Sequence, residues 1–360
     1  MMNTVNLRKN IIALASQPEC EEPVVSAYFD MEKPLPALLA EFGAWVWTAR
    51  KSFEAQNRRQ FDRAAANVYN WLKNKSGKCR SAAVFARDGD PQFLMPLQFK
   101  VPMETYFQAD KLPAIYPLVE IKDRFKRFVV VLINQDCARI IAMNLGETPV
   151  EILTERSEVA ERRGREWTPE HSLNHNREGD KKFINEKVSI IEQLMAKRGN
   201  NALLISGEAR YVSQLVEALP KALQEKRVDQ IHTGVRDERL RSILEDAIGS
   251  SLAVADGESE TAVKGLVRAY RTNRCATFGV SSTTSALQMG QADRLIISRV
   301  LRHEDREVLV RLASQHGIPI ETVRGSLLLD AQGGVGALLR HSKQSYEYEL
   351  RKEHPLVRAS

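Results

Sequence analysis

The stretch RFVVVLINQDCARIIAMNLGE, residues 127–147, sets the fold class of this chain. Two runs of mostly β-branched and other apolar residues flank a short polar turn at 134–136, a pattern typical of two adjoining strands. PVEILTE at 149–155 predicts a third strand, and NALLIS at 201–206 predicts another buried one. Amphipathic helices are expected at 181–198 and 211–223. Strands that alternate with helices indicate an α/β domain built on a mixed sheet.

The same alternation continues on both sides of this stretch. Towards the N-terminus we predict strands at 24–30, 82–86 and 92–99 and helices at 36–56 and 58–73. Towards the C-terminus we predict helices at 236–271, 281–289 and 305–316, strands at 292–298 and 318–323, and a glycine turn at 332–336. The predicted fold class is therefore α/β with three α/β domains. Their boundaries are 1–125, 126–240 and 241–345, followed by a polar tail at 346–360.

The composition fits a globular protein in a reducing compartment. The chain has 360 residues, 43% hydrophobic and 27% charged, and its formal net charge is +6. This basic balance favours a polyanion such as nucleic acid only weakly, because 46 acidic residues accompany 52 basic ones. The four cysteines lack CxxC spacing, and no apolar run approaches the ~20 residues of a membrane span. We therefore expect a cytoplasmic protein that binds neither membrane nor DNA.

Several motifs lack residues that catalysis or cofactor binding would require. Gly333-Gly334-Val335-Gly336 lacks the Lys-Ser/Thr of a phosphate loop, so it is interpreted as a turn. His171 and His175 have HxxxH spacing, but no third metal ligand is evident. No Gly-x-Ser-x-Gly elbow is present either. We therefore predict no catalytic residues, no cofactor and no metal.

Residues 156–182 form a long segment without apolar periodicity inside a compact domain, and we expect a loop there. Loops of that length are often functional. Arginine can pair with phosphate, while tryptophan and histidine can stack on bases, which favours contact with RNA. The alternative is a solvated linker, because acidic residues nearly balance the basic ones. The candidate RNA-binding residues of this loop are Arg162, Arg163, Gly164, Arg165, Trp167, His171, His175 and Arg177.

A second basic set lies on the helix predicted at 58–73 and just after it. The helix would bury Phe61 and Trp71 and turn its basic residues outward. Such a stripe either binds RNA or merely keeps the protein soluble. The candidate residues are Arg58, Arg59, Arg63, Lys73 and Lys75.

Taken in chain order, five segments resemble the bacterial branch of the archaeal and eukaryotic class I release factor and Pelota family. They are VSAYFD, RFVVVLINQDCARII, NALLISGEARYVSQLVEALP, ALQMGQADRLIIS and GGVGALLR, and they span about residues 24–341. The resemblance implies an RNase H-like middle domain and a small C-terminal α/β sandwich related to kink-turn-binding ribosomal proteins.

Two departures from that family shape the functional expectation. The 156–182 segment contains no Gly-Gly-Gln, the tripeptide that promotes peptide release in true release factors, and the first domain has no Asn-Ile-Lys-Ser. The chain therefore resembles the non-hydrolytic relatives, and most of all Balon-type ribosome hibernation factors. The resemblance implies an A-site occupant that contacts ribosomal RNA of the decoding and peptidyl-transferase centres and is served by elongation factor Tu or another GTPase. A Pelota-like rescue factor and a peptidyl-tRNA hydrolase are the alternatives.

Overall fold

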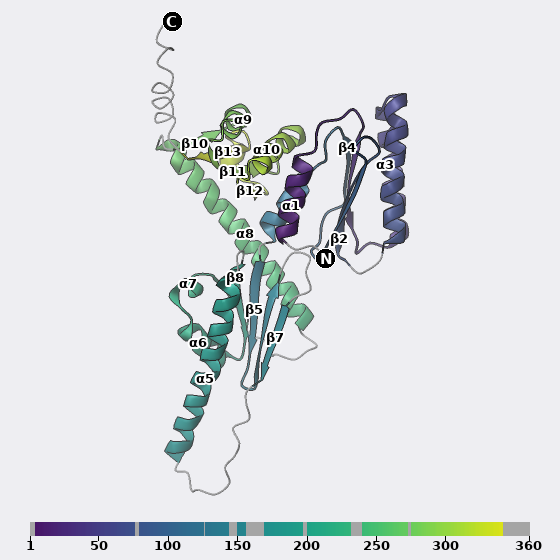
Figure 1. The fold of residues 1–360 in the computed structure, drawn as a ribbon. Helices are drawn as coiled ribbons and strands as arrows, with labels where there is room; N and C mark the ends of the chain where they lie inside the picture. The colour runs from purple at the N-terminus through teal and green to yellow at the C-terminus, as the bar shows by residue number, and fades with distance from the viewer. Residues whose placement is uncertain are drawn as a thin grey trace. The chain divides into compact units, whose positions relative to one another are not determined.

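The computed structural model describes residues 4–75, 79–125, 127–143, 150–155, 169–196, 200–231, 240–272 and 275–340. Three sheets, one of five strands and two of four, are covered by helices in this part of the chain, so the predicted α/β class is confirmed (Figure 1). The chain divides into two compact units. One consists of Met1–Arg124 and Ala255–Ser360, and the other of Phe125–Val254. The first and last sheets therefore share one unit, although they were expected in separate domains.

The N-terminal sheet has the strand order β3-β2-β1-β4 and is antiparallel throughout. Its strands are β1 (Val24–Asp30), β2 (Ser81–Arg87), β3 (Phe93–Phe99) and β4 (Tyr106–Asp110). The strand predicted at 24–30 and the hairpin formed by β2 and β3 are confirmed. The central strands β1 and β2 are buried along almost their whole length, because helices or loops cover both faces of the sheet.

One face of this sheet is covered by α2 (Leu35–Ala49), the 3₁₀ turn η1 (Arg50–Ser52) and α3 (Ala55–Asn74). The core between them is aromatic. Phe29 of β1 meets Phe42 of α2, with ring centroids 5.6 Å apart, and Phe53 stacks on Phe61 of α3 at 4.9 Å. The helix predicted at 36–56 ends earlier, at Ala49, because the chain turns through η1 and becomes extended at Phe53.

The opposite face of the N-terminal sheet meets the segment around Ala114. The hydroxyl of Tyr28 donates to the carbonyl of Ala114 at 2.5 Å, and the hydroxyl oxygen of Ser26 accepts from its N–H at 3.0 Å. The same unit also contains α1 (Thr4–Ala15) and α4 (Tyr116–Arg124).

The C-terminal sheet has the order β10-β13-β11-β12, in which only β11 and β12 run parallel. Its strands are β10 (Ala276–Phe278), β11 (Ala292–Ser298), β12 (Ile320–Val323) and β13 (Val335–Leu339). Its helices are α8 (Leu240–Arg271), α9 (Val280–Gln288), α10 (His303–Gln315) and α11 (Leu327–Asp330). Val263 and Leu266 of α8 pack against Ile296 and Leu329 to form one core of this sheet.

The glycines at 333–336 form a turn that leads into β13. Gly333 and Gly334 have φ values of +91° and +72°, which L side chains rarely adopt, so the predicted turn is confirmed at these two positions. Gly336 already lies in the strand. A Cβ atom there would come within 2.7 Å of a Leu266 side-chain carbon and of the Thr277 carbonyl oxygen.

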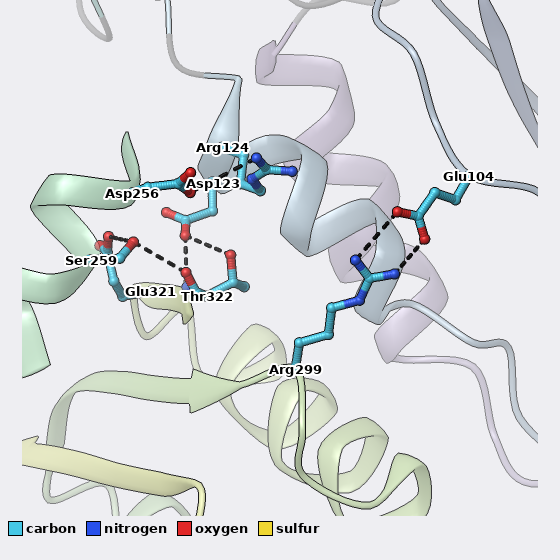
Figure 2. Close-up of polar contacts among 8 residues, drawn as sticks. All are labelled: Glu104, Asp123, Arg124, Asp256, Ser259, Arg299, Glu321 and Thr322. Carbon is cyan, nitrogen blue, oxygen red and sulfur yellow. Dashed lines mark hydrogen bonds and ion pairs between the residues drawn. The ribbon is translucent and has the colours of Figure 1, made fainter. Parts of the chain in front are cut away.

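Polar contacts tie the N-terminal and C-terminal segments of this unit together (Figure 2). The carboxylate of Asp123 accepts from the backbone N–H of Thr322 at 2.7 Å and from its hydroxyl at 2.9 Å. Arg299, which directly follows β11, makes a two-point ion pair with Glu104. Each pair joins residues about two hundred positions apart in the sequence, so local sequence patterns cannot predict these contacts.

The other unit is built on a mixed sheet of order β7-β6-β5-β8-β9. β5, β6 and β7 are antiparallel neighbours, while β8 and β9 run parallel to β5. Its elements are β5 (Arg127–Ile133), β6 (Cys137–Met143), β7 (Val150–Glu155), α5 (Pro169–Ala196), β8 (Asn200–Gly207), α6 (Ala209–Ala218), α7 (Lys221–Gln224) and β9 (Arg227–Ile231). Apolar residues from α5, α6 and the strands form its core.

Among the described residues, every helix is too short or too polar to cross a membrane.

Candidate nucleic-acid interface

The outer face of α3 presents the basic residues predicted from the sequence. Phe61, Val68 and Leu72 are buried against the sheet, which fixes the rotation of the helix. The face turned away from the sheet therefore carries the polar residues. Four of the five predicted basic residues are exposed: Arg58, Arg59, Arg63 and Lys73. The fifth, Lys75, lies just beyond the helix and is half-buried.

Most of these cations are available to a ligand. The side chains of Arg59 and Lys73 form no hydrogen bond or ion pair with any residue that the structure describes. Arg63 is 3.4 Å from Asp88, but its side chain is 73% exposed, so this surface pair contributes little to stability. Arg58 donates from Nε to the carbonyl of Phe53 at 2.6 Å and helps to shape the start of the helix. The arrangement gives α3 a positive outer face whose charge is only partly compensated.

The corner between α2 and α3 is held by specific contacts. Arg50 in η1 lies 2.9 Å from the carboxylate of Asp62, and Phe53 stacks on Phe61. These pairs attach the connection between the two helices to the side of α3, and so they fix the path of the chain at the corner.

An exposed tryptophan on α2 adds a stacking surface near this corner. The side chain of Trp47 is 67% exposed, and the ammonium of Lys51 lies 3.3 Å from the centre of its ring. A large exposed indole next to a cation can stack on a nucleobase and contact its phosphate. Sequence reasoning missed this residue. The signal was that Trp47 falls outside the apolar stripe formed by Leu38 and Phe42.

The other predicted RNA-binding set lies only partly within the described residues. Arg162, Arg163, Gly164, Arg165 and Trp167 lie outside them. His171, His175 and Arg177 lie on α5, for which the structure describes the backbone but not these side chains. The prediction of a loop over 156–182 is therefore wrong from Pro169 onward, where α5 begins. A proline is well tolerated at a helix start, and residues 169–182 contain Leu173 as their one large apolar residue, so apolar periodicity could not reveal the first half of α5.

Two observations bear on metal or acid–base chemistry. His171 and His175 lie four positions apart on α5 and so share one face of the helix, but the described residues contain no group of three or more possible metal ligands. The acidic residue Asp136 lies in the turn between β5 and β6, where its N–H donates to the Asn134 side chain at 2.9 Å.

Several buried groups with shifted pKa values lie where α10 and neighbouring residues pack against the N-terminal part of the same unit. Burial raises the pKa of Glu307 and of Tyr28, and burial together with Arg306 lowers the pKa of His303. The carboxylate of Glu307 accepts the backbone N–H groups of Ile115 and Tyr116 at 2.9 and 3.0 Å. Shifted pKa values can mark an active site, but here each follows from packing between two parts of one unit.

The sequence comparison identifies the family of the middle segment. Residues 113–250 match the family model described as bacterial archaeo-eukaryotic release factor family 10. Over these residues the chain is similar to the bacterial archaeo-eukaryotic release factor-like proteins. No curated protein matches the sequence significantly.

Several solved structures are similar to this release factor-like chain. An archaeal translation termination factor, aRF1, is 16% identical, and the match covers 94% of this chain and 98% of that one with a TM-score of 0.31. Dom34 of S. cerevisiae, a translation termination-like factor, is 11% identical over 74% of this chain and 82% of its own, with a TM-score of 0.44. Archaeal Pelota, in a model bound to the ribosome with ABCE1, is 12% identical over 93% and 94%, with a TM-score of 0.44.

Proposed function

We propose that this chain is a ribosome-binding translation factor that occupies the A site without releasing peptide and acts in hibernation under stress. The observation that carries the proposal is the outer face of α3. Arg59 and Lys73 have no partner there among the described residues, and Trp47 is exposed on the neighbouring helix. Uncompensated cations and an exposed aromatic ring on one domain are features that binding to folded or single-stranded RNA requires.

The sequence supports occupancy rather than hydrolysis. None of its 19 glycines begins a Gly-Gly-Gln tripeptide, so the residue set that promotes peptide release in related factors is missing from this sequence. A factor of this kind acts by filling the site and holding ribosomal RNA of both subunits through distributed contacts. Delivery by elongation factor Tu or another GTPase is part of the proposal, as is contact of the 156–182 segment with the peptidyl-transferase centre.

Co-sedimentation with vacant ribosomes tests the proposal. The chain should pellet with ribosomes at low salt and be released at high salt, because binding to phosphates displaces counterions. A double variant, Arg59→Gln with Lys73→Gln, should bind about tenfold more weakly and show a salt dependence reduced by about two charges. The matched control is Lys33→Gln with Arg302→Gln, which also removes two positive charges.

The control separates specific contacts from net charge. Lys33 and Arg302 already lie 2.9 Å from Glu41 and Asp305, so their charges are largely compensated and their loss should leave binding nearly unchanged. Equal weakening by both double variants would show that only net charge matters, and would remove α3 from the proposed interface. Arg163→Ala with Trp167→Ala tests the 156–182 segment in the same way.

A peptidyl-tRNA hydrolysis assay on the same ribosomes decides between occupancy and enzymatic activity. Binding without release of peptide is the expected result. Release by the chain alone would replace the proposal with a peptidyl-tRNA hydrolase, and release only with added partner proteins would indicate a rescue factor.

A further inference from the structure

A cavity of about 350 Å³ lies between α3 and the edge strand β3. Its volume falls at the lower end of the range for small-molecule sites, about 300–1,000 Å³. Four amide side chains line it, those of Asn67, Asn70, Asn74 and Gln98, together with Trp71, Lys75 and Leu94. No part of the function proposed above assigns a role to this cavity.

The fold brings these side chains together by regular spacing. Asn70 and Trp71 come three and four positions after Asn67, and Asn74 comes four and three positions after them, so these residues lie along one face of α3. Across from them, Leu94 and Gln98 are four positions apart in β3 and therefore share one side of the sheet.

The pairing of β3 identifies that side as the one that α3 covers. Leu94 is opposite Ala86, whose side chain belongs to the core beneath α2 and α3. Because β3 is the edge strand, the cavity lies at the border of the sheet, between the helix and this strand.

The amide groups of the cavity are free to bind a ligand. The side chains of Asn67, Asn70, Asn74 and Gln98 make no hydrogen bond to any residue within the described ranges. Each amide offers two donors and one carbonyl acceptor side by side. A cluster of such groups matches the alternating donors and acceptors on the edge of a nucleobase, which asparagine and glutamine commonly recognise.

The remaining lining residues suit the rest of a nucleotide. Trp71 is half-buried, so its indole is held by the core while it borders the cavity, and Leu94 is 45% exposed opposite it. A flat aromatic ring and an apolar side chain can contact the faces of a base. Lys75 lies at the cavity, and Arg63 lies one helical turn before Asn67 on the same face. At a rise of about 1.5 Å per residue, the backbone positions of Arg63 and Lys75 are about 18 Å apart along the helix axis. This separation is enough for the two cations to flank a short stretch of backbone phosphates.

From this combination we infer that the cavity binds a single unpaired base of an RNA strand, with its phosphates held by the basic residues at either end. The inference rests on the proposed function, because it assigns to the RNA-binding face of α3 a pocket for one base. It goes further in predicting that recognition includes the base and not only the phosphates.

Fluorescence anisotropy with the full chain can separate base contacts from phosphate contacts. The probe is a labelled seven-nucleotide ribose–phosphate strand that carries one central base, prepared with each of the four bases, and a wholly abasic strand of the same length. The wild-type chain should bind at least one base-bearing strand about fivefold or more tightly than the abasic strand. The double variant Asn70→Ala with Asn74→Ala should lose this preference and bind both strands as the wild type binds the abasic one.

Two control variants make the outcome specific. Asn57→Ala removes an amide in the first turn of α3, far from the cavity, and should keep the preference. Arg59→Gln should weaken binding of both strands by the same factor, as expected for a phosphate contact. Asn70 and Asn74 are exposed, so their replacement should not impair folding, which circular dichroism would verify.

A wild-type chain that does not distinguish the strands, or a double variant that keeps the preference, would overturn the inference. Ribosome co-sedimentation of the same proteins keeps this result separate from the proposed function. If the wild type binds ribosomes and only the base preference is missing, the pocket assignment fails alone. If the base preference is present without ribosome binding, the proposed function fails and the pocket remains.

Discussion

The carboxylate of Glu307 lies 2.9 Å from the backbone nitrogen of Ile115, a residue 192 positions earlier in the chain. The same carboxylate also accepts the N–H of Tyr116. These bonds lower the pKa of Glu307, but burial outweighs them, so its pKa lies above the ordinary value. Helix α10 is thus attached to the segment before α4 through a buried acid that binds its proton more readily in the folded state.

Glu307→Gln should change how stability depends on pH. Because the pKa of Glu307 is raised in the folded state, its protonation stabilises the fold. This contribution to the free energy of unfolding is complete below the unfolded pKa of about 4.5, and it is lost as the pH rises through the folded pKa. Glutamine cannot titrate, so the free energy of unfolding of the variant relative to wild type should increase as the pH rises above about 4.5. Urea unfolding of both proteins at several pH values measures this difference. The effects of the other titrating groups largely cancel in it, because both proteins share those groups. A difference that stays constant with pH would contradict the assignment.

Arg311 should be far more important for stability than its neighbours on α10. Its guanidinium donates to the carbonyls of Leu14, Ala15 and Pro113 at 3.0, 2.8 and 2.8 Å. Arg311→Met would leave the carbonyls of Leu14 and Pro113 without this donor, while Ala15 keeps the amide of Gln315, and we expect a loss of about 2–4 kcal/mol in urea unfolding. The control is Arg302→Gln on the same helix, a largely exposed residue whose loss should cost less than about 0.5 kcal/mol.

Gly207 cannot be replaced without disturbing the five-stranded sheet. Its φ is +141°, and a Cβ atom would lie 1.8 Å from the carbonyl oxygen of Ile133. Gly207→Ala should therefore destabilise the Phe125–Val254 unit by more than about 3 kcal/mol. Gly249→Ala is a matched control in the same unit, because Gly249 is an exposed helical residue with open space around it. It should stabilise the unit by about 0.5–1 kcal/mol. Similar melting curves for the two variants would refute the steric argument.

Trp47→Ala tests the stacking surface beside α3. Because the side chain is mostly exposed, its loss should leave the free energy of unfolding within about 0.5 kcal/mol of wild type. Affinity for ribosomes, measured by quantitative co-sedimentation, should fall by about tenfold, within the 1–3 kcal/mol that a base–aromatic contact contributes. Trp47→Tyr keeps an aromatic face and should recover most of the binding. Unchanged affinity in Trp47→Ala would exclude this residue from the interface.

The sequence predicted those elements whose apolar pattern is local and regular. The strands 24–30 and 292–298 match β1 and β11 to the residue, and the helix predicted at 58–73 lies within α3. The edge strands β4 and β9, of five residues each, had too little pattern to be found. The start of α5 was missed because its first half is polar.

The candidate site, like the fold, could be predicted from the sequence only in part. The basic residues of α3 could be predicted, because a helix with one buried face must present its other residues to solvent. The exposure of Trp47 had a signal in the sequence, its position outside the apolar stripe of α2, but that signal was missed. The grouping of three asparagines with Gln98 could not be predicted, since it depends on a strand that comes later in the chain. The contacts of Glu307 and Arg311 have no local signal at all.

The bond from Arg311 to Leu14 spans 297 residues, and this separation fixes an order of events during synthesis. At about 5–20 residues per second, α1 emerges roughly 15–60 s before the arginine that binds its last carbonyls. The Phe125–Val254 unit is continuous in sequence and meets no such delay. While the nascent chain grows, the middle unit can therefore fold before the last carbonyls of α1 receive their hydrogen bonds from Arg311.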